Sequence, residues 1–380
     1  MSILFAALGM AVVLIVLGDA FETVVLPRRV TRQASLARIY YRFTWMFWAR
    51  VVRSVISRKQ QATYLSFYGP LSLIVLLMLW ATGLIVGFGL VHWASGSTIK
   101  TPEGIESFWS YLYLSGTTFF TLGIGDITPA TVLGQGICAF EAGMGFGFLA
   151  LVIGYLPVLN QSFSRREVNI SLLDARAGSP PTAGELLRRH SHDQGVEELR
   201  QLFHEWERWS ADLLESHLSY PVLAYFRSQH DNLSWLEALT AILDASAFVI
   251  ANLEGPCNRQ AQLTFAITRH AIVDLAQIFN CRPRNPERDR LPPDTLEALR
   301  STLTSAGMRL QEGEAVAQKL SELRKMYEPY AYSLSKHMHI VIPPWVAESR
   351  HADDWQTSAW GRSKGFQIEG PSDTGREEHF

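Results

Sequence analysis

Residues 101–131 read TPEGIESFWSYLYLSGTTFFTLGIGDITPAT, and they decide how the whole chain is interpreted. This stretch is semi-polar but nearly free of charge, and within it Thr121-Leu-Gly-Ile-Gly-Asp126 carries two glycines in alternate positions. Alternating glycines let a short backbone segment adopt conformations in which successive carbonyl groups point the same way. What such a segment does depends on its flanks, which are long and apolar on both sides.

Charged residues are distributed very unevenly along the chain. Its 380 residues include 34 basic and 36 acidic side chains, and 48 % are hydrophobic, close to the globular average of about 45–50 %. Between residues 60 and 164, however, the charged residues are only Lys100, Glu103, Glu106, Asp126 and Glu141. The composition excludes a disordered or collagen-like chain. A pI near 6.6 excludes a strongly basic nucleic-acid binder, and three cysteines exclude a disulfide framework.

Three segments are long enough to cross a membrane as helices, namely 2–26, 63–94 and 132–159. Each exceeds the roughly 20 apolar residues that a hydrocarbon core about 30 Å thick requires. Core helices are the alternative, but they rarely stay apolar on every face for this length. The first segment could instead be a cleaved signal peptide. No basic residue precedes it, and Arg28 and Arg29 follow it, which favours a retained helix.

Basic residues predict the orientation of these helices. Residues 27–63 contain nine basic side chains and no acid, and Arg165 and Arg166 follow the third segment. Because short basic loops stay in the cytoplasm, we expect the N-terminus outside and the C-terminus inside a cell (inner) membrane. Residues 35–58 combine arginines with aromatic and β-branched residues, as in a helix lying in the inner interface. Membrane lipids are therefore an expected partner, with a basic connector folded onto the cytoplasmic domain as the alternative.

The stretch between the second and third segments predicts a re-entrant loop. Thr101-Pro102-Glu103 has the form of a helix start, with Thr as N-cap and Pro at the first position. The helix would end near Phe119, which makes it too short to cross the membrane and return. Non-helical backbone at membrane depth survives only where it is buried in protein or lines a polar path. A short helix followed by the alternating glycines therefore predicts a pore loop.

Residues 63–159 resemble the two-helix pore module of tetrameric potassium channels. Thr-Leu-Gly-Ile-Gly-Asp matches the family's Thr-Val-Gly-Tyr-Gly-Asp filter at four of six positions, and the order of the surrounding elements, with Trp109 in the outer part, is the same. The resemblance implies that backbone carbonyls replace the hydration shell of K+. It assigns the ion-coordinating filter to Thr121, Leu122, Gly123, Ile124 and Gly125, with K+ as the bound ion and no other cofactor.

Two positions depart from the family's pattern. Ile124 replaces a Tyr whose hydroxyl braces the filter from behind, and Phe120 replaces a Thr just before the filter. Both changes make the surroundings of the filter more apolar and leave weakly selective conduction open. Glu103, Glu106 and Asp126 are predicted to make the outer mouth acidic, which would concentrate cations there.

The third segment carries a buried charge and several glycines. Glu141 is a carboxylate at membrane depth, which is costly unless it is paired. We expect it to form a hydrogen bond behind the filter, to Ser115, Thr117 or a Tyr of the short helix. The resemblance assigns a hinge to Gly145, for which close helix packing is the alternative. Helical spacing from Gly145 directs Phe146, Leu149, Ile153 and Pro157 toward the pore. An inner gate is expected near Ile153 and Pro157.

Each chain supplies one pore loop and has no internal repeat that could supply a second. A filter needs a ring of four carbonyl sets, so we expect a homotetramer. The predicted fold class is an all-α membrane protein with three transmembrane helices, a re-entrant pore helix and a selectivity filter, followed by an all-α cytosolic domain. The expected parts are a transmembrane helix at 1–27, a basic interfacial segment at 28–62, the pore module at 63–160, a linker at 161–184, the cytosolic domain at 185–345 and a polar tail at 346–380.

The C-terminal half predicts helices at 195–217, 232–253, 259–279, 293–306 and 312–333. It contains no phosphate-cradling glycine loop and no nucleophile–base or metal constellation, so an enzyme is not expected. The leading hypothesis is a potassium-selective channel gated by this domain in response to an unknown cytosolic ligand. A weakly selective cation channel and a non-conducting, membrane-anchored signalling protein are the alternatives.

Overall fold

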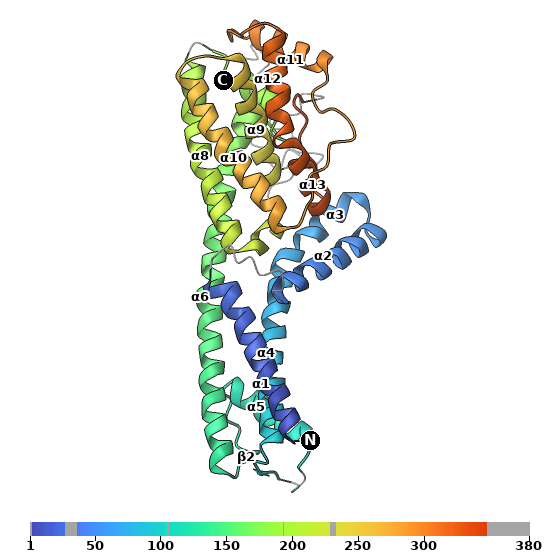
Figure 1. Ribbon diagram of the computed structural model, residues 1–380, viewed down its shortest axis with the longest axis vertical. Helices are drawn as coiled ribbons and strands as arrows, with labels where there is room; N and C mark the ends of the chain where they lie inside the picture. Colours follow the sequence, from blue (N-terminus) through green and yellow to red (C-terminus); the bar gives the residue numbers. More distant parts are fainter. Residues whose placement is uncertain are drawn as a thin grey trace, which may run out of the picture. The chain divides into compact units, whose positions relative to one another are not determined.

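The computed structural model describes residues 2–26, 36–102, 104, 106–192, 194–228 and 233–347. It is almost entirely helical (Figure 1), which confirms the predicted all-α class. Its described strands are β1 (Ile99–Lys100) and β2 (Thr128–Pro129), which pair antiparallel. The chain divides into two compact units, the first made of Met1–Ser162 with Ser219–Phe226 and the second of Phe163–Leu218 with Arg227–Phe380.

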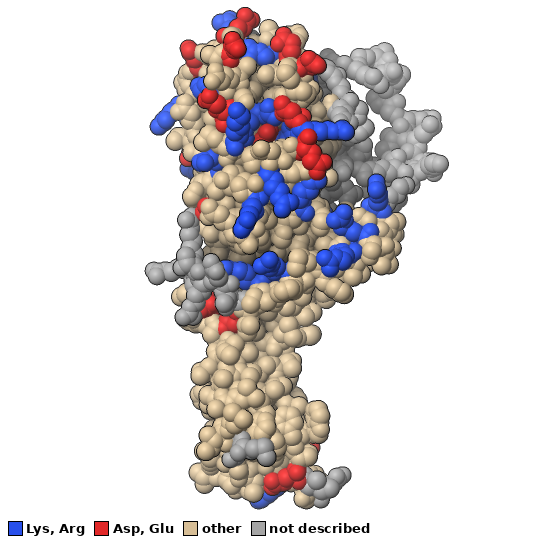
Figure 2. Space-filling model, turned by 45° about the vertical axis from the view of Figure 1, so that its right-hand side comes forward, with Lys and Arg blue, Asp and Glu red and all other residues tan. Residues whose placement is uncertain are grey.

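Four helical stretches are long and apolar enough to cross a membrane. Three correspond to the predicted segments: α1 (Ser2–Ala20) with the π-helical turn η1 (Phe21–Val25), α4 (Tyr68–Ala94), and α6 (Val132–Ala177). The fourth is α9 (Trp235–Asn252), whose residues are buried inside the second unit almost without exception. A central core position explains the apolar composition of α9, so three helices remain as spans. On the face drawn in Figure 2, the surface of these three spans is nearly free of charged side chains.

Helix α1 packs along α4 through close contact between their backbones. A Cβ atom on Gly9 would lie 2.6 Å from the Gly87 carbonyl oxygen, and one on Gly87 would lie 2.7 Å from Val13. Small residues of this kind let membrane helices approach each other. At the other end of α1, the buried Asp19 carboxylate accepts hydrogen bonds from Trp80 Nε1 at 2.9 Å and from the Ala37 N–H at 3.1 Å.

The basic segment after α1 forms two helices, α2 (Leu36–Val55) and α3 (Arg58–Ser66). The Asp19 carboxylate lies at the N-terminus of α2, where the helix dipole favours a negative charge. Helix α2 has two apolar faces. One is buried in the unit, and the other is exposed and consists of residues spaced by four, namely Ile39, Phe43, Phe47, Val51 and Val55. This second face agrees with the expected interfacial position, which stays a prediction.

The short pore helix begins later than predicted. Helix α5 spans Phe108–Phe119, and its N-cap is Ser107, whose hydroxyl accepts from the Ser110 N–H at 3.3 Å. The predicted start at Thr101 is wrong because the preceding residue, Lys100, is held in an extended conformation by pairing with Thr128. The chain then turns, with φ of +69° at Gly104.

In the second unit, α9 lies centrally and packs against α7 (Ala183–Arg189), α10 (Pro256–Ile278) and α12 (Glu314–Lys325). Figure 1 labels α9, α10 and α12 of this group. Helix α8 (Gly195–Ser219) precedes the short turn η2 (Pro221–Tyr225), and α11 (Pro293–Ser305) and α13 (Glu328–Met338) complete the fold. Four of the five helices predicted here agree within a few residues. The prediction of one helix at 312–333 is wrong, because the chain breaks between α12 and α13, where Pro329 occupies the first turn of a new helix.

The segment assigned as a linker, 161–184, is helical for most of its length. Helix α6 continues without interruption through Pro157 to Ala177 and ends at Gly178, where φ is +82°. Thr182 then caps α7 by accepting a hydrogen bond from the Glu185 N–H at 3.2 Å. Most of the expected polar tail, from residue 348 on, lies outside the described residues.

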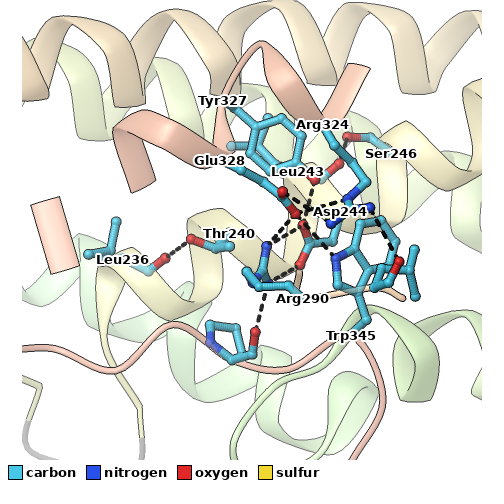
Figure 3. A network of polar contacts seen from close by, with 12 residues as sticks. Leu236, Thr240, Leu243, Asp244, Ser246, Arg290, Arg324, Tyr327, Glu328 and Trp345 are labelled. Carbon is cyan, nitrogen blue, oxygen red and sulfur yellow. Dashed lines mark hydrogen bonds and ion pairs between the residues drawn. The ribbon is translucent and has the colours of Figure 1, made fainter. Parts of the chain in front are cut away.

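A buried ionic network joins Asp244 of α9 to residues between Arg290 and Trp345 (Figure 3). Arg290 donates to both oxygens of Asp244, at 3.1 and 2.6 Å, and to Glu328 at 3.1 Å. Asp244 also accepts from the Tyr327 hydroxyl at 2.5 Å, and Trp345 donates to Glu328 at 3.5 Å. Burial opposes the charge on Arg290, but the Asp244 carboxylate beside it raises the pKa of Arg290, so the guanidinium stays charged.

Replacing Asp244 by Ala should destabilise the second unit strongly, because it leaves the Arg290 guanidinium buried without its main partner. Removing one member of a buried ion pair costs about 3–5 kcal/mol. Calorimetric unfolding of the purified protein measures the effect. Glu205→Ala is the matched control, because Glu205 pairs with Arg176 in a half-exposed position, where such a pair contributes at most about 1 kcal/mol. Equal unfolding temperatures for the two variants would contradict the prediction.

Candidate functional site

The segment that follows α5 has alternating backbone conformations. Thr121, Gly123 and Gly125 have φ of +54°, +57° and +83°, whereas Leu122 and Ile124 between them do not have positive φ. Alternation of residues with and without positive φ turns successive peptide groups toward the same side. This is the geometry expected from the two glycines, and it extends to Thr121, where a positive φ costs about 1–3 kcal/mol because the residue has a Cβ.

The segment is continuous with the C-terminal end of α5. The N–H groups of Thr121 and Leu122 donate back to the carbonyls of Thr118 and Thr117, at 2.9 and 2.8 Å. The carbonyl end of a helix carries a partial negative charge. The electrostatics of this end of α5 therefore favour a cation.

The apolar side chains of this segment are uncovered in the single chain. Phe120, Leu122 and Ile124 are 57 %, 62 % and 60 % exposed. Adjacent exposed apolar side chains of this size mark a surface that another molecule covers. Phe120 and Ile124 are the two positions that depart from the potassium-channel motif; the Phe120 ring packs edge-on against Phe119 at 5.4 Å between centroids, and both side chains stay largely exposed.

A fully buried polar cluster lies beside the last turns of α5. The Glu141 carboxylate of α6 accepts a hydrogen bond from the Ser115 hydroxyl of α5, and its other oxygen lies 3.3 Å from His92 Nε2 of α4. All three side chains are inaccessible to solvent. The hydrogen bond expected between Glu141 and Ser115 is thus present, whereas Thr117 donates to carbonyls of its own helix.

His92 was missed in the sequence analysis. It is the only histidine before residue 190, and it lies in the last turn of an otherwise apolar helix. A solitary titratable residue at membrane depth is the signal that could have identified it. Together, Glu141, Ser115 and His92 join α4, α5 and α6 near the C-terminal end of α5.

Two tyrosines of α5 fix the loops before and after this helix. Tyr113 donates to Asp126 at 2.9 Å and so ties the end of the glycine segment to the helix. Tyr111 donates to Glu106 at 3.0 Å, and Glu106 also accepts from the Ile99 N–H at 3.3 Å. Glu106 thus holds together the loop between β1 and α5.

Trp109 and Glu103 were also predicted near the outer mouth. Trp109 lies in the first turn of α5, where it is exposed and close to Phe108. Glu103 lies outside the described residues.

The predicted hinge and gate residues lie on α6 in different settings. A Cβ atom on Gly145 would lie only 1.9 Å from the Phe119 carbonyl oxygen, so Gly145 is where α6 touches the end of α5. This contact favours the close-packing alternative for Gly145. Ile153 is exposed, as are Phe146 and Leu149 before it and Pro157 after it. The face predicted to line a pore is therefore uncovered in the single chain.

Residues 73–160 match a protein-family model described as "Ion channel". The match covers α4 from Leu73, the whole of α5, the glycine segment and α6 as far as Asn160, about a quarter of the chain. No curated protein and no solved structure matches the chain. The chain therefore contains an ion channel domain within a multi-pass membrane protein, and such a domain conducts ions passively.

Replacing Gly145 by Ala should disrupt the ion channel domain, because the added methyl group would collide with the Phe119 carbonyl. Overpacking of a tight contact costs about 1–3 kcal/mol or more. The expected result is reduced ion flux into liposomes and a lower unfolding temperature. Gly147→Ala is the control on the same helix, since nothing lies within 4 Å of its Cβ position. An unchanged Gly145→Ala protein would contradict the close contact between α6 and the end of α5.

Proposed function

We propose that this protein is a potassium-selective channel in which four copies of the chain surround one pore. The observation that carries the proposal is the alternation of positive φ at Thr121, Gly123 and Gly125. A backbone of this form presents several carbonyl oxygens in a row, which is what replaces the hydration shell of K+ in a selectivity filter. The match of residues 73–160 to an ion channel family supports the conducting role.

We propose four-fold assembly because one chain supplies only a part of the ring of carbonyls that binds an ion. One chain contributes one strand of carbonyls, whereas coordination of a dehydrated ion needs a ring. The uncovered side chains of Leu122 and Ile124 beside this strand, and of Ile153 on α6, supply the surface that neighbouring copies would cover or that would line the pore. Closed cyclic symmetry is the usual form of such homo-oligomers.

The proposed role of Glu141 is to hold α5 in place behind the filter. Its carboxylate links Ser115 and His92, so that three helices are joined at the point where the carbonyl strand begins. In a low-dielectric surrounding, hydrogen bonds to a charged group are stronger than in water. A rigid support of this kind keeps the carbonyls from collapsing when an ion leaves.

The proposed orientation places the N-terminus outside and the second unit in the cytoplasm of a cell (inner) membrane, where an unidentified ligand would gate the pore. The exposed apolar face of α2 and its arginines Arg42, Arg50 and Arg53 support a position at the inner leaflet.

Reversal potentials of the purified protein in planar bilayers test the selectivity. With KCl on one side and NaCl on the other, we expect a reversal potential close to the potassium equilibrium potential. Gly123→Ala should abolish this selectivity, since an alanine at φ of +57° is unfavourable by about 1–2 kcal/mol in each of four copies. Gly18→Ala, at an α1 position with open space around it, is the control.

A reversal potential near zero for the unmodified protein would replace potassium selectivity by weak cation selectivity. The absence of any current, with intact tetramers, would favour the non-conducting signalling protein.

Glu141→Gln should weaken the filter without changing the fold, because glutamine retains the shape but removes the charge that Ser115 and His92 share. The expected result is a slower and less complete recovery of current after a period without K+. Glu205→Gln, at an exposed position of the second unit, should recover like the parent. Equal recovery in both variants would remove Glu141 from the support of the filter.

A further inference from the structure

Eight residues leave the second unit and pack in the first. Helix α8 belongs to the second unit up to Leu218, and the chain returns to that unit at Arg227. Between them, residues 219–226, called here the docking segment, include the turn η2 and lie among the helices of the first unit. The hydrophobic periodicity of α8 and α9 does not explain why residues 219–226 pack in the first unit.

Tyr225 of the docking segment enters an aromatic cluster on the first unit. Its ring lies 6.1 Å from Tyr41 in a stacked arrangement, 5.1 Å from Trp45 and 5.2 Å from Tyr68, measured between ring centroids. Only 5 % of Tyr225 is exposed. Aromatic pairs in these geometries contribute beyond the area that they bury, so the contact is specific as well as apolar.

The surface that receives Tyr225 is ordered by its own hydrogen bonds. The Tyr68 hydroxyl donates to the Tyr41 carbonyl at 3.0 Å, and it lies 2.8 Å from the Thr44 hydroxyl. The Tyr40 hydroxyl donates to the Ser72 carbonyl at 2.9 Å. These bonds join α2 to α4, so the two helices together form one preformed site.

The two ends of the docking segment also contact membrane helices. A Cβ atom added to Gly69 of α4 would lie 2.7 Å from the Phe226 ring. Any larger residue at this position would therefore collide with the ring. The Tyr220 ring lies 5.6 Å from that of Tyr155 on α6. Tyr155 is two residues after Ile153 and two before Pro157, the positions expected to form the inner gate.

Both flanks of the docking segment are fixed inside the second unit. His217 is buried and donates from Nδ1 to the Leu213 carbonyl at 2.8 Å, while Arg166 lies 3.4 Å from its Nε2. Burial and the charge of Arg166 lower the pKa of His217 to about 3, so its ring is neutral. After the segment, Arg227 donates to the carbonyls of Met338 and His339 at 2.8 and 3.0 Å.

We infer that the aromatic surface of α2 and α4 is a binding site for the docking segment of the same chain, and that its occupation sets the open probability of the pore. The inference rests on the proposed channel function. The docking segment packs within the first unit, and at both of its ends the chain continues into the second unit. A rearrangement that pulls on these ends would change how well the segment docks. Because Tyr220 contacts α6 beside the expected gate, the change reaches the pore-lining helix.

The test uses the full chain and the contact between Gly69 and Phe226. Gly69→Ala places a methyl group where the Phe226 ring lies and should expel the segment, whereas Phe226→Ala makes room for that methyl group. Single-channel recordings should show open probability changed about fivefold or more in Gly69→Ala, the lower end of typical coupling between sites.

In the Phe226→Ala background, adding Gly69→Ala should change the open probability less than the same substitution does in the parent. Gly18→Ala is the control, and potassium over sodium selectivity should be unchanged throughout.

Chymotrypsin cleavage after Tyr225 provides a readout that needs no current. The docked segment should resist cleavage in the parent and in the control, and it should be cut at least several-fold faster in Gly69→Ala. Faster cleavage with unchanged open probability would overturn the gating role, and unchanged cleavage would overturn the docking itself. A parent protein that passes no current overturns the proposed channel function and the gating role with it, whereas the cleavage rates would still decide whether the segment docks.

Discussion

The Glu141 carboxylate, enclosed by α4, α5 and α6, is the constraint on which the ion channel domain depends. A charge at this depth is tolerated only with partners on all sides, and Ser115 and His92 supply them from the other two helices. The three helices therefore cannot separate or slide without leaving a charge unpaired. The strained backbone that begins at Thr121 is built on this support, because it continues directly from the helix that Ser115 anchors.

Properties that depend on local sequence were predictable. Long charge-free runs identified the three spans, and the alternation of Gly123 and Gly125 with apolar residues identified the irregular segment whose φ values alternate. The hydrogen bond between Glu141 and Ser115 was foreseen from the physics of one buried charge, since a carboxylate in an apolar helix requires a nearby donor. The sequence left Ser115, Thr117 and the tyrosines of the short helix open as donors, and the packing of α6 against α5 selects Ser115.

Features that depend on non-local contacts were not predictable from one sequence. The helix expected to start at Thr101 does not form there, because Lys100 pairs with Thr128. One of these residues precedes α5 in the sequence and the other follows it. His92 joins Glu141 only after α4 and α6 pack. Tyr225 lies in a short apolar stretch that looks like any turn between two helices, and its partners are more than 150 residues earlier in the chain.

The glycine contact between α1 and α4 has a consequence for how the protein meets its lipid surroundings. Because Gly9 and Gly87 bring the two backbones together, α1 covers one side of α4 and presents its own leucines and isoleucines outward. A change in bilayer thickness acts on a spanning helix by tilting it. On that side of α4, such tilting would act first on α1 and would be passed to α4 at the Gly9–Gly87 contact and through the Asp19–Trp80 hydrogen bond. Mechanical sensitivity to the bilayer would therefore depend on a helix that lies outside the matched ion channel domain.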